Sequence, residues 1–193
     1  MFEKSLLLKI HEAQWPLLGR RTESVEELEE KKQQTGGFVI RRAEDKDIPE
    51  LMRILVEVNM VHHKIRPDLF KGPATKYSEQ ELKTLIRKEE DPIFVCPLGD
   101  GKLAGYIFCQ TIMTEESDLR TGIRTLYIDD LCVDEACRGH HVAERLYHHA
   151  IDYAKATGCY NVTLHVWGGN EGAEEFYRKM GLKPQYTCLE TIL

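Results

Sequence analysis

The amino-acid sequence predicts a mixed α/β (α+β) fold whose central sheet is mostly antiparallel and is flanked by helices. The expected elements follow one another as strand, two helices, three strands, helix, strand, helix and strand. This order fits a largely antiparallel sheet better than a doubly wound parallel one. Hydrophobic residues make up 42% of the 193 residues and charged residues 30%, as in globular proteins that bury a core.

The chain is predicted to contain an N-terminal helical appendage, residues 1–37, and a domain that covers residues 38–193. Ser24 and Glu27 are predicted to form a capping box, in which each side chain bonds a free backbone amide of the other, and two glycines are expected to end the charged helix that follows. Dimerisation of two copies through this segment, which would give a homodimer, is one alternative for its use.

The strands of the domain are expected where runs of apolar residues lie between turn signals. A Gly-Asp-Gly-Lys turn at residues 99–102 separates two of them. The expected strands cover residues 38–41, 92–96, 103–112, 126–133, 161–167 and 185–193.

Four helices are expected in the same domain. The first begins at Asp47, with a proline in its first turn, the second opens at Tyr77, and the last covers residues 170–180. The third starts near His140 or His141, where apolar residues begin to recur every fourth position. This spacing gives a helix one buried face.

Composition restricts the partners of the protein. The net charge of −6 argues against a general nucleic-acid surface, because phosphate binding needs basic residues, and mildly favours a cationic partner such as an amine. No apolar run is long enough to span a bilayer and no secretory signal is recognised, so we expect no membrane association and a cytoplasmic location. The six cysteines form no CxxC pair and the histidines no HExxH pattern, so no metal site is expected.

The segment Arg138-Gly139 leads directly into the third helix. The start of a helix leaves backbone N–H groups free and carries a partial positive charge. A glycine there lets the backbone approach a ligand, so the segment suits a phosphate group. An ordinary connection between a strand and a helix is the alternative.

Here the sequence resembles the GCN5-related N-acetyltransferase (GNAT) superfamily. Its acetyl-CoA motif, (Arg/Gln)-x-x-Gly-x-(Gly/Ala), is similar to Arg138-Gly139-His140-His141-Val142-Ala143, with a departure at His141, where the family has glycine. A second segment, residues 170–182, is similar to the family's Asn…Ala…Phe-Tyr-x-Lys-x-Gly-Leu pattern. The resemblance covers residues 38–193 and implies the GNAT fold.

The resemblance also implies acetyl-CoA as cosubstrate and places it on this sequence. The backbone amides of the loop 138–143 would hold the pyrophosphate, and the end of the strand at residues 131–133 would pair with the pantetheine arm. Asn170 would lie near that arm, and Tyr177 would lie near the sulfur. The implied binding residues are Leu131, Cys132, Val133, Arg138, Gly139, His140, His141, Val142, Ala143, Asn170 and Tyr177. The side chain of His141 is expected to weaken or alter CoA binding, either by crowding the phosphates or by changing the backbone conformation.

Two catalytic candidates follow from the resemblance. Tyr177 matches the position whose hydroxyl protonates the CoA sulfur, although the apolar stripe of its helix makes a purely structural role the alternative. Asp129 matches a position that often carries an acidic residue, acting as base or holding the cationic amine. The alternative is that one of the two aspartates pairs with a buried arginine or caps a bulge. By strand alternation, Asp129 is expected to share a face with Leu131 and Val133, and Asp130 to share the other face with Ile128 and Cys132.

The function that the resemblance implies is acetyl-CoA-dependent N-acetyl transfer, directly to a primary amine and without an acyl-enzyme. A small molecule is favoured over a protein as the acceptor. His62 and His63, in the expected loop 61–72, are further candidates for binding the substrate or relaying a proton. A non-catalytic acyl-CoA-binding or sensing domain is the alternative, because His141 departs from the motif.

Overall fold

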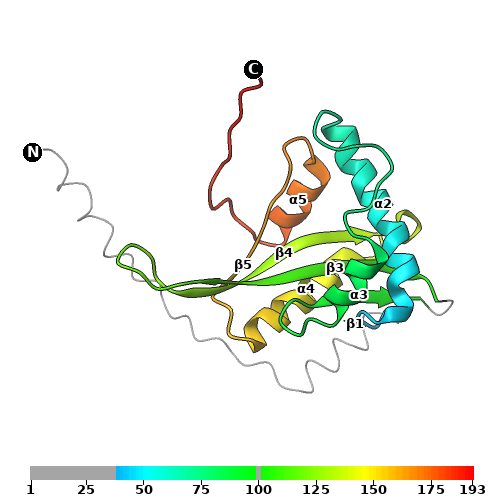
Figure 1. The fold of residues 1–193 in the computed structure, drawn as a ribbon, viewed down its shortest axis with the longest axis horizontal. Helices are drawn as coiled ribbons and strands as arrows, with labels where there is room; N and C mark the ends of the chain where they lie inside the picture. Colours follow the sequence, from blue (N-terminus) through cyan, green and yellow to red (C-terminus); the bar gives the residue numbers. More distant parts are fainter. Residues whose placement is uncertain (1–37, 99–100) are drawn as a thin grey trace, which may run out of the picture. The chain divides into compact units, whose positions relative to one another are not determined.

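The computed structural model describes residues 38–98 and 101–193 (Figure 1). The predicted N-terminal appendage, with its capping box at Ser24, and the first two residues of the predicted turn at 99–102 lie outside these residues. Their predicted structure therefore stays a prediction.

The centre of the domain is a five-stranded mixed sheet in the order β1-β2-β3-β4-β5. Neighbouring strands are antiparallel except β4 and β5, which run parallel. This confirms the predicted mixed, mostly antiparallel sheet. The strands are β1 (Arg41–Arg42), β2 (Ile93–Pro97), β3 (Leu103–Thr114), β4 (Ile123–Val133) and β5 (Asn161–Leu164).

Helices pack on both faces of the sheet (Figure 1). One hydrophobic cluster joins α2 and α3 to one face, and a second joins α4 and α5 to the other. The helices are α2 (Ile48–Ile65), α3 (Glu79–Ile86), α4 (Val142–Ala156) and α5 (Glu171–Lys179), with short 3-10 helices at Asp45–Asp47 and Glu135–Cys137.

Strand β3 shows why both faces are covered. Its side chains alternate between the two clusters: Tyr106 and Phe108 pack toward α2 and α3, whereas Ile107 and Cys109 pack toward α4. All four are buried. Because successive side chains of a strand point to opposite faces, a run of apolar residues needs a helical layer on each side.

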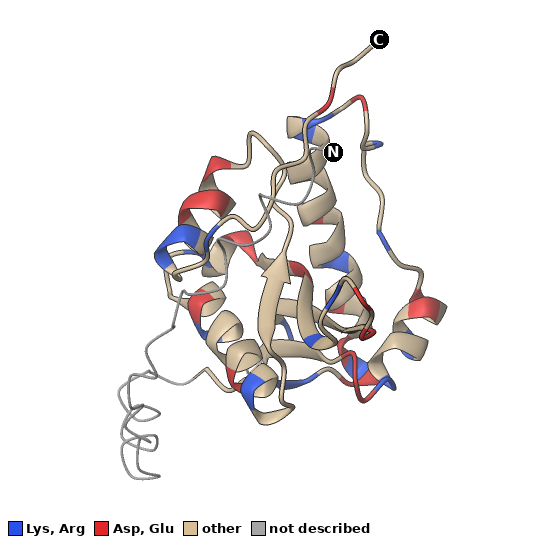
Figure 2. Ribbon diagram, turned by 90° about the vertical axis from the view of Figure 1, so that its left-hand side faces the viewer, with Lys and Arg blue, Asp and Glu red and all other residues tan. Residues whose placement is uncertain are grey.

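Charged residues of both signs share the outer surfaces of the helices (Figure 2). On α3, the Nζ atom of Lys83 lies 2.6 Å from Oε1 of Glu79, one turn away. On α2, Arg53 bonds Glu50 in the same way, at 2.9 Å. Such pairs on exposed helix faces stabilise a helix by about 0.3–0.5 kcal/mol each.

The structure corrects several predicted boundaries. Helix α2 continues to Ile65, so that His62 and His63 lie on a helix and not in the expected loop, and β5 ends at Leu164 rather than at residue 167. The first strand contains only residues 41–42 of the described chain.

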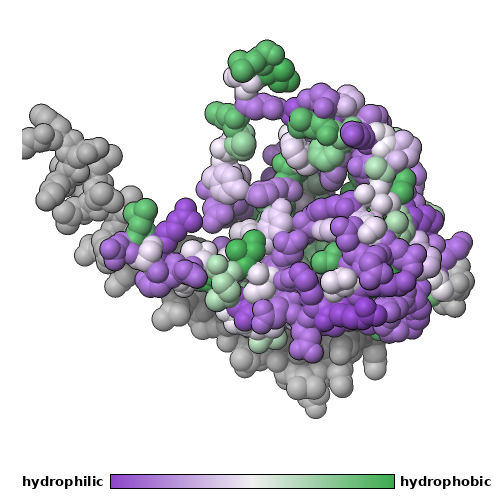
Figure 3. Space-filling view, viewed as in Figure 1, coloured by the Kyte–Doolittle hydropathy of each residue, from purple (hydrophilic) through white to green (hydrophobic). Residues whose placement is uncertain are grey.

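The predicted final strand at residues 185–193 is wrong. This segment forms no ladder with the sheet, and its apolar residues are exposed, with Leu189 at 88% (Figure 3). A β pattern in a sequence becomes a strand only when a neighbouring strand supplies hydrogen bonds, which this segment lacks within the described residues.

Candidate active site

A β-bulge in β4 determines the geometry of the site. Ile128 pairs with Cys109 and Asp130 pairs with Phe108, so Asp129 is an extra residue without a partner on β3. A bulge interrupts the alternation of a strand. The carboxylates of Asp129 and Asp130 therefore both contact residues on the side of the sheet that α2 and α3 cover.

The bulge corrects the predicted faces of β4. Leu131 and Val133 pack with the cluster around α4, away from Asp129, and Ile128 lies with them, away from Asp130. Cys132 alone of the predicted partners shares the face of Asp130, in the cluster with Tyr106 and Phe108. Sequence alternation missed this arrangement, since one unpaired residue shifts every later side chain to the other face.

Asp129 is held by two residues that precede α3. The Nζ atom of Lys76 lies 2.6 Å from Oδ2 of Asp129, and the hydroxyl of Tyr77 donates a hydrogen bond of 2.8 Å to the same oxygen. Burial, and then this bond to Asp129, raise the pKa of Tyr77, so the hydroxyl keeps its proton. The predicted alternative, in which an aspartate pairs with a buried arginine, is replaced by a lysine and a tyrosine.

Asp130 is a candidate base that sequence reasoning did not select. Burial raises the pKa of its carboxyl to about 6, although a hydrogen bond of 3.0 Å from the hydroxyl of the fully buried Tyr106 acts in the opposite direction. A carboxyl with a raised pKa is a stronger base than an ordinary one and is typical of catalytic sites. The signal in the sequence was a pair of carboxylates within a strand.

Cys132 lies beside this pair and is unsuited to nucleophilic catalysis. Burial, followed by the charge of Asp130, raises the pKa of its thiol to about 12. The reactive form of a cysteine is the thiolate, which this environment suppresses. The contacts of Cys132 agree with packing, and the expected direct transfer needs no covalent intermediate.

The negative charge of Asp130 also acts on Tyr177 of α5. Burial, and then the charge of Asp130, raise its pKa, so its hydroxyl keeps its proton at neutral pH. Its ring also contacts Tyr147 of α4, with centroids 6.4 Å apart, and packs in the cluster around α4. The contacts of Tyr177 show the structural role that the apolar stripe of its helix predicted as the alternative, and its hydroxyl remains a proton donor.

The loop between β4 and α4 exposes a row of backbone donors. Among the described residues, no carbonyl accepts a hydrogen bond from the N–H groups of residues 139–144. Gly139 has a φ of 80°, and Arg138 to His141 are all exposed. The buried face of α4, which includes Val142 and Leu146, fixes this helix start against the sheet.

His141 adopts the backbone conformation that favours glycine. Its φ is 60° and its ψ 19°, and it is the N-terminal cap residue of α4. Its Nδ1 atom lies 3.0 Å from Oε2 of Glu144, one turn into the helix. A residue with a side chain adopts this left-handed conformation at a cost of about 1–2 kcal/mol.

These residues fit the phosphate groups of a CoA molecule. Free N–H groups at the start of a 15-residue helix are donors for an anion, and Gly139 has no atom within 4 Å of the position of a Cβ. Asn170 has a structural role as well, since its side-chain oxygen accepts a hydrogen bond of 3.3 Å from Ala173 and caps α5.

Three aromatic rings meet, one each from α2, the loop after α2 and the segment after β5. The ring of Phe70 lies 5.0 Å from that of His62 and 5.2 Å from that of Trp167, centroid to centroid. Burial, and then the charge of Lys76, lower the pKa of His62. His63 is used locally, with its Nδ1 atom 2.6 Å from the carbonyl oxygen of Phe70.

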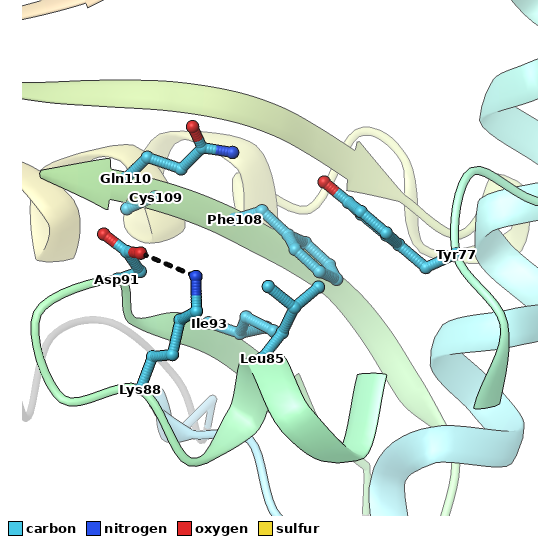
Figure 4. A pocket seen from close by; sticks show the side chains of 8 residues that line it. All are labelled: Tyr77, Leu85, Lys88, Asp91, Ile93, Phe108, Cys109 and Gln110. Atoms are coloured by element: carbon cyan, nitrogen blue, oxygen red, sulfur yellow. Dashed lines mark hydrogen bonds and ion pairs between the residues drawn. The ribbon is translucent and has the colours of Figure 1, made fainter. Parts of the chain in front are cut away.

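A small cavity of about 150 Å³ lies between α3 and the sheet (Figure 4). Its walls include Leu85, Ile93 and the rings of Tyr77 and Phe108, which stack with centroids 5.6 Å apart. Neither Asp129 nor Asp130 lines it, and only Tyr77 belongs to both places. The cavity is therefore distinct from the carboxylate pair.

Within residues 38–98 and 101–193, no helix is both long and apolar enough to cross a membrane. In the same residues, no three His, Cys, Asp or Glu side chains gather in a way that would hold a metal ion.

Comparisons with known proteins identify the family of the chain. The chain matches the Acetyltransferase (GNAT) family over residues 58–182, which include the bulge, the loop before α4 and Tyr177. An uncharacterised N-acetyltransferase of Methanocaldococcus jannaschii is 32% identical over 108 residues, which are 56% of this chain and 46% of that protein. The alignment thus spans about half the length of this relative.

Solved structures show the same fold. A mutant of the BH1408 protein from Bacillus halodurans has a TM-score of 0.77 and 27% identity, over 80% of this chain and 99% of that one. Glucosamine-6-phosphate N-acetyltransferase from Arabidopsis thaliana has a TM-score of 0.60 and 21% identity, over 81% and 98%. Because the family match covers more than half of the sequence, the chain belongs to the acetyltransferase (GNAT) family.

Proposed function

We propose that the protein is an acetyl-CoA-dependent N-acetyltransferase that moves the acetyl group directly to a primary amine, with a small molecule favoured over a protein as acceptor. The observation that carries the proposal is the bulge that presents Asp129 and Asp130 on one side of β4, the strand that leads into the loop before α4. Acidic groups on a strand that leads into an anion-binding loop suit a cationic amine and a phosphate-bearing donor together.

The chain's own residues perform four tasks in this proposal. The N–H groups of residues 139–144 hold the pyrophosphate, and the strand end 131–133 orients the pantetheine arm. Bound acetyl-CoA supplies the activated acetyl thioester. Asp129 holds the acceptor's ammonium, and Asp130, the stronger base, takes up the proton that the amine must lose, directly or through water. Tyr177, whose hydroxyl stays protonated, donates the proton that the departing sulfur needs.

The test measures free thiol from acetyl-CoA over a panel of diamines, amino acids, aminoglycosides and lysine peptides. Release of thiol with at least one small amine, lost in Asp130→Asn, is the expected result. Asp152→Asn, on the exposed face of α4, serves as the matched control and should retain the rate. Equal rates in both variants would contradict the assigned role of Asp130.

A second candidate, a non-catalytic acyl-CoA-binding domain, is favoured by one observation. His141 places a side chain, bonded to Glu144, at the position where the family has glycine. Binding of CoA measured by calorimetry, together with no thiol release over the whole panel, would support this candidate and exclude the transferase.

A further inference from the structure

The chain carries a primary amine of its own at the carboxylate pair. The Nζ atom of Lys76 lies 2.6 Å from Oδ2 of Asp129 and 5.4 Å from the centroid of the Tyr77 ring. The Lys76 side chain is 47% exposed and that of Asp129 only 11%. A flexible alkylamine reaching a mostly buried carboxylate is the arrangement that an acceptor amine would adopt.

Charge interactions link Lys76 to the proposed reacting groups. Its charge favours the ionised form of Asp130, and Asp130 in turn acts on Tyr177. The charge of Lys76 also helps to lower the pKa of His62 of α2, whose ring contacts that of Phe70. The amine is therefore within electrostatic range of the proposed base, which is itself within range of the proposed acid.

We propose that Lys76 is itself an acetyl acceptor, so that the protein acetylates this side chain within the same chain. The inference rests on the proposed function and adds a modification site to it. The Lys76 side chain is half-exposed, so solvent screens its ion pair with Asp129, and Lys76 can leave Asp129 either to react or to let another amine enter.

The reaction balances with acetyl-CoA alone. Nζ forms a bond to the acetyl carbonyl carbon, the C–S bond breaks, and its electron pair leaves with the sulfur. The Nζ ammonium gives up two protons, which pass by the carboxylates to solvent. Tyr177 donates one proton to the departing sulfur and regains one from solvent. The net result is one proton on the thiol of CoA and one in solvent. The products are acetylated Lys76 and free CoA. The acetylated side chain has no charge, so its ion pair with Asp129 is lost.

Lys83 provides the matched control within the same chain. Its Nζ atom lies at the same distance, 2.6 Å, from a carboxylate oxygen, and its side chain is 37% exposed. That partner, Glu79, is on the surface of α3, with no tyrosine hydroxyl bonded to it among the described residues. Lys76 and Lys83 thus differ in their surroundings and resemble each other in exposure and pairing.

The experiment incubates the purified full chain with acetyl-CoA and follows each lysine by peptide mass spectrometry. Lys76 is expected to gain one acetyl group at least about tenfold faster than Lys83, because its position supplies an effective concentration that a surface lysine lacks. The rate constant should not change with protein concentration. Equal rates at both lysines, or an equal Lys76 rate in the urea-unfolded chain, would overturn the proposal.

A second readout does not depend on turnover. An amine-reactive acetyl ester labels accessible lysines chemically, and saturating CoA should lower the labelling of Lys76 while leaving Lys83 unchanged. No protection of Lys76 by bound CoA would also overturn the proposal. Thiol release with panel amines but an unmodified Lys76 refutes this inference and leaves the proposed function standing. Absence of both refutes both. Acetylation of Lys76 with a silent panel supports the inference and acetyl transfer, and contradicts only the preference for a small-molecule acceptor.

Discussion

The hydroxyl of Tyr106 donates a hydrogen bond of 3.0 Å to Oδ2 of Asp130, and this bond joins the core of the protein to its proposed base. Tyr106 is fully buried, and burial raises its pKa well above the ordinary value, so it acts as a donor and never as a competing acid. The bond favours the carboxylate, whereas burial of Asp130 favours the protonated form, and burial is the larger effect.

The pH dependence of the rate follows from this balance. With a pKa of about 6, Asp130 is protonated below that pH and accepts a proton above it, so kcat should rise as the pH increases through about 6. Tyr106→Phe removes a hydrogen bond that favours the carboxylate, so the rise in kcat should move upward by about one pH unit. A hydrogen bond to a charged group is strong enough to shift a pKa by this amount. The control is Tyr153→Phe, whose hydroxyl bonds the carbonyl of Glu89. A pH profile that is the same in Tyr106→Phe and wild type would contradict the coupling.

Asp129→Asn should lower the rate by about a hundredfold at every pH, because the neutral amide no longer holds the acceptor's ammonium for deprotonation by Asp130. CoA affinity, measured by calorimetry, should stay within about twofold of wild type, since the anion-binding loop lies elsewhere. Normal activity in this variant would remove Asp129 from the site.

Tyr177→Phe should lower kcat by about a hundredfold with little change in the KM for acetyl-CoA, because the ring still packs and only the proton donor is lost. Tyr147→Phe, in the adjacent ring of the same cluster, is the control and should keep its kcat. If Tyr177→Phe turns over at the wild-type rate with saturating substrates, its role is structural only.

His141→Gly should raise the free energy of unfolding by up to about 1 kcal/mol. It relieves a left-handed conformation that costs about 1–2 kcal/mol, and the greater freedom of glycine in the unfolded chain offsets part of the gain. Urea denaturation measures the difference. His140→Gly, whose φ is not positive, should instead be neutral or slightly destabilising. CoA affinity is expected to rise in His141→Gly, and an unchanged affinity would show that the side chain does not disturb the phosphates.

Gly105→Ala should destabilise the fold by about 2 kcal/mol, since an added Cβ would lie 2.6 Å from the backbone oxygen of Cys132 and would force β3 and β4 apart. Gly168→Ala has no atom within 4 Å of the new Cβ and serves as the matched control, with little change expected. Equal midpoints of urea unfolding for the two variants would show that β3 and β4 adjust without cost.

The sequence by itself determined the elements with strong local signals. The fourfold spacing from Val142 to Ala154 places α4, and the segment that opens at Tyr77 indicates α3, which the structure begins at Glu79 with Ser78 as its cap. These signals are local because helix periodicity and capping involve residues only a few positions apart. The resemblance in residues 138–143 and 170–182 was likewise enough to indicate the family, which the comparisons confirm.

The tertiary structure decided what depends on pairing between distant segments. An unpaired residue in β4 puts Asp129 and Asp130 on one side, and the segment before α3 brings Lys76 and Tyr77 to Asp129. The segment 185–193 has a strand pattern and forms no strand. Register, bulges and strand formation depend on hydrogen bonds to a partner strand, which no local pattern specifies, and the pKa of Asp130 depends on burial that only the assembled core creates.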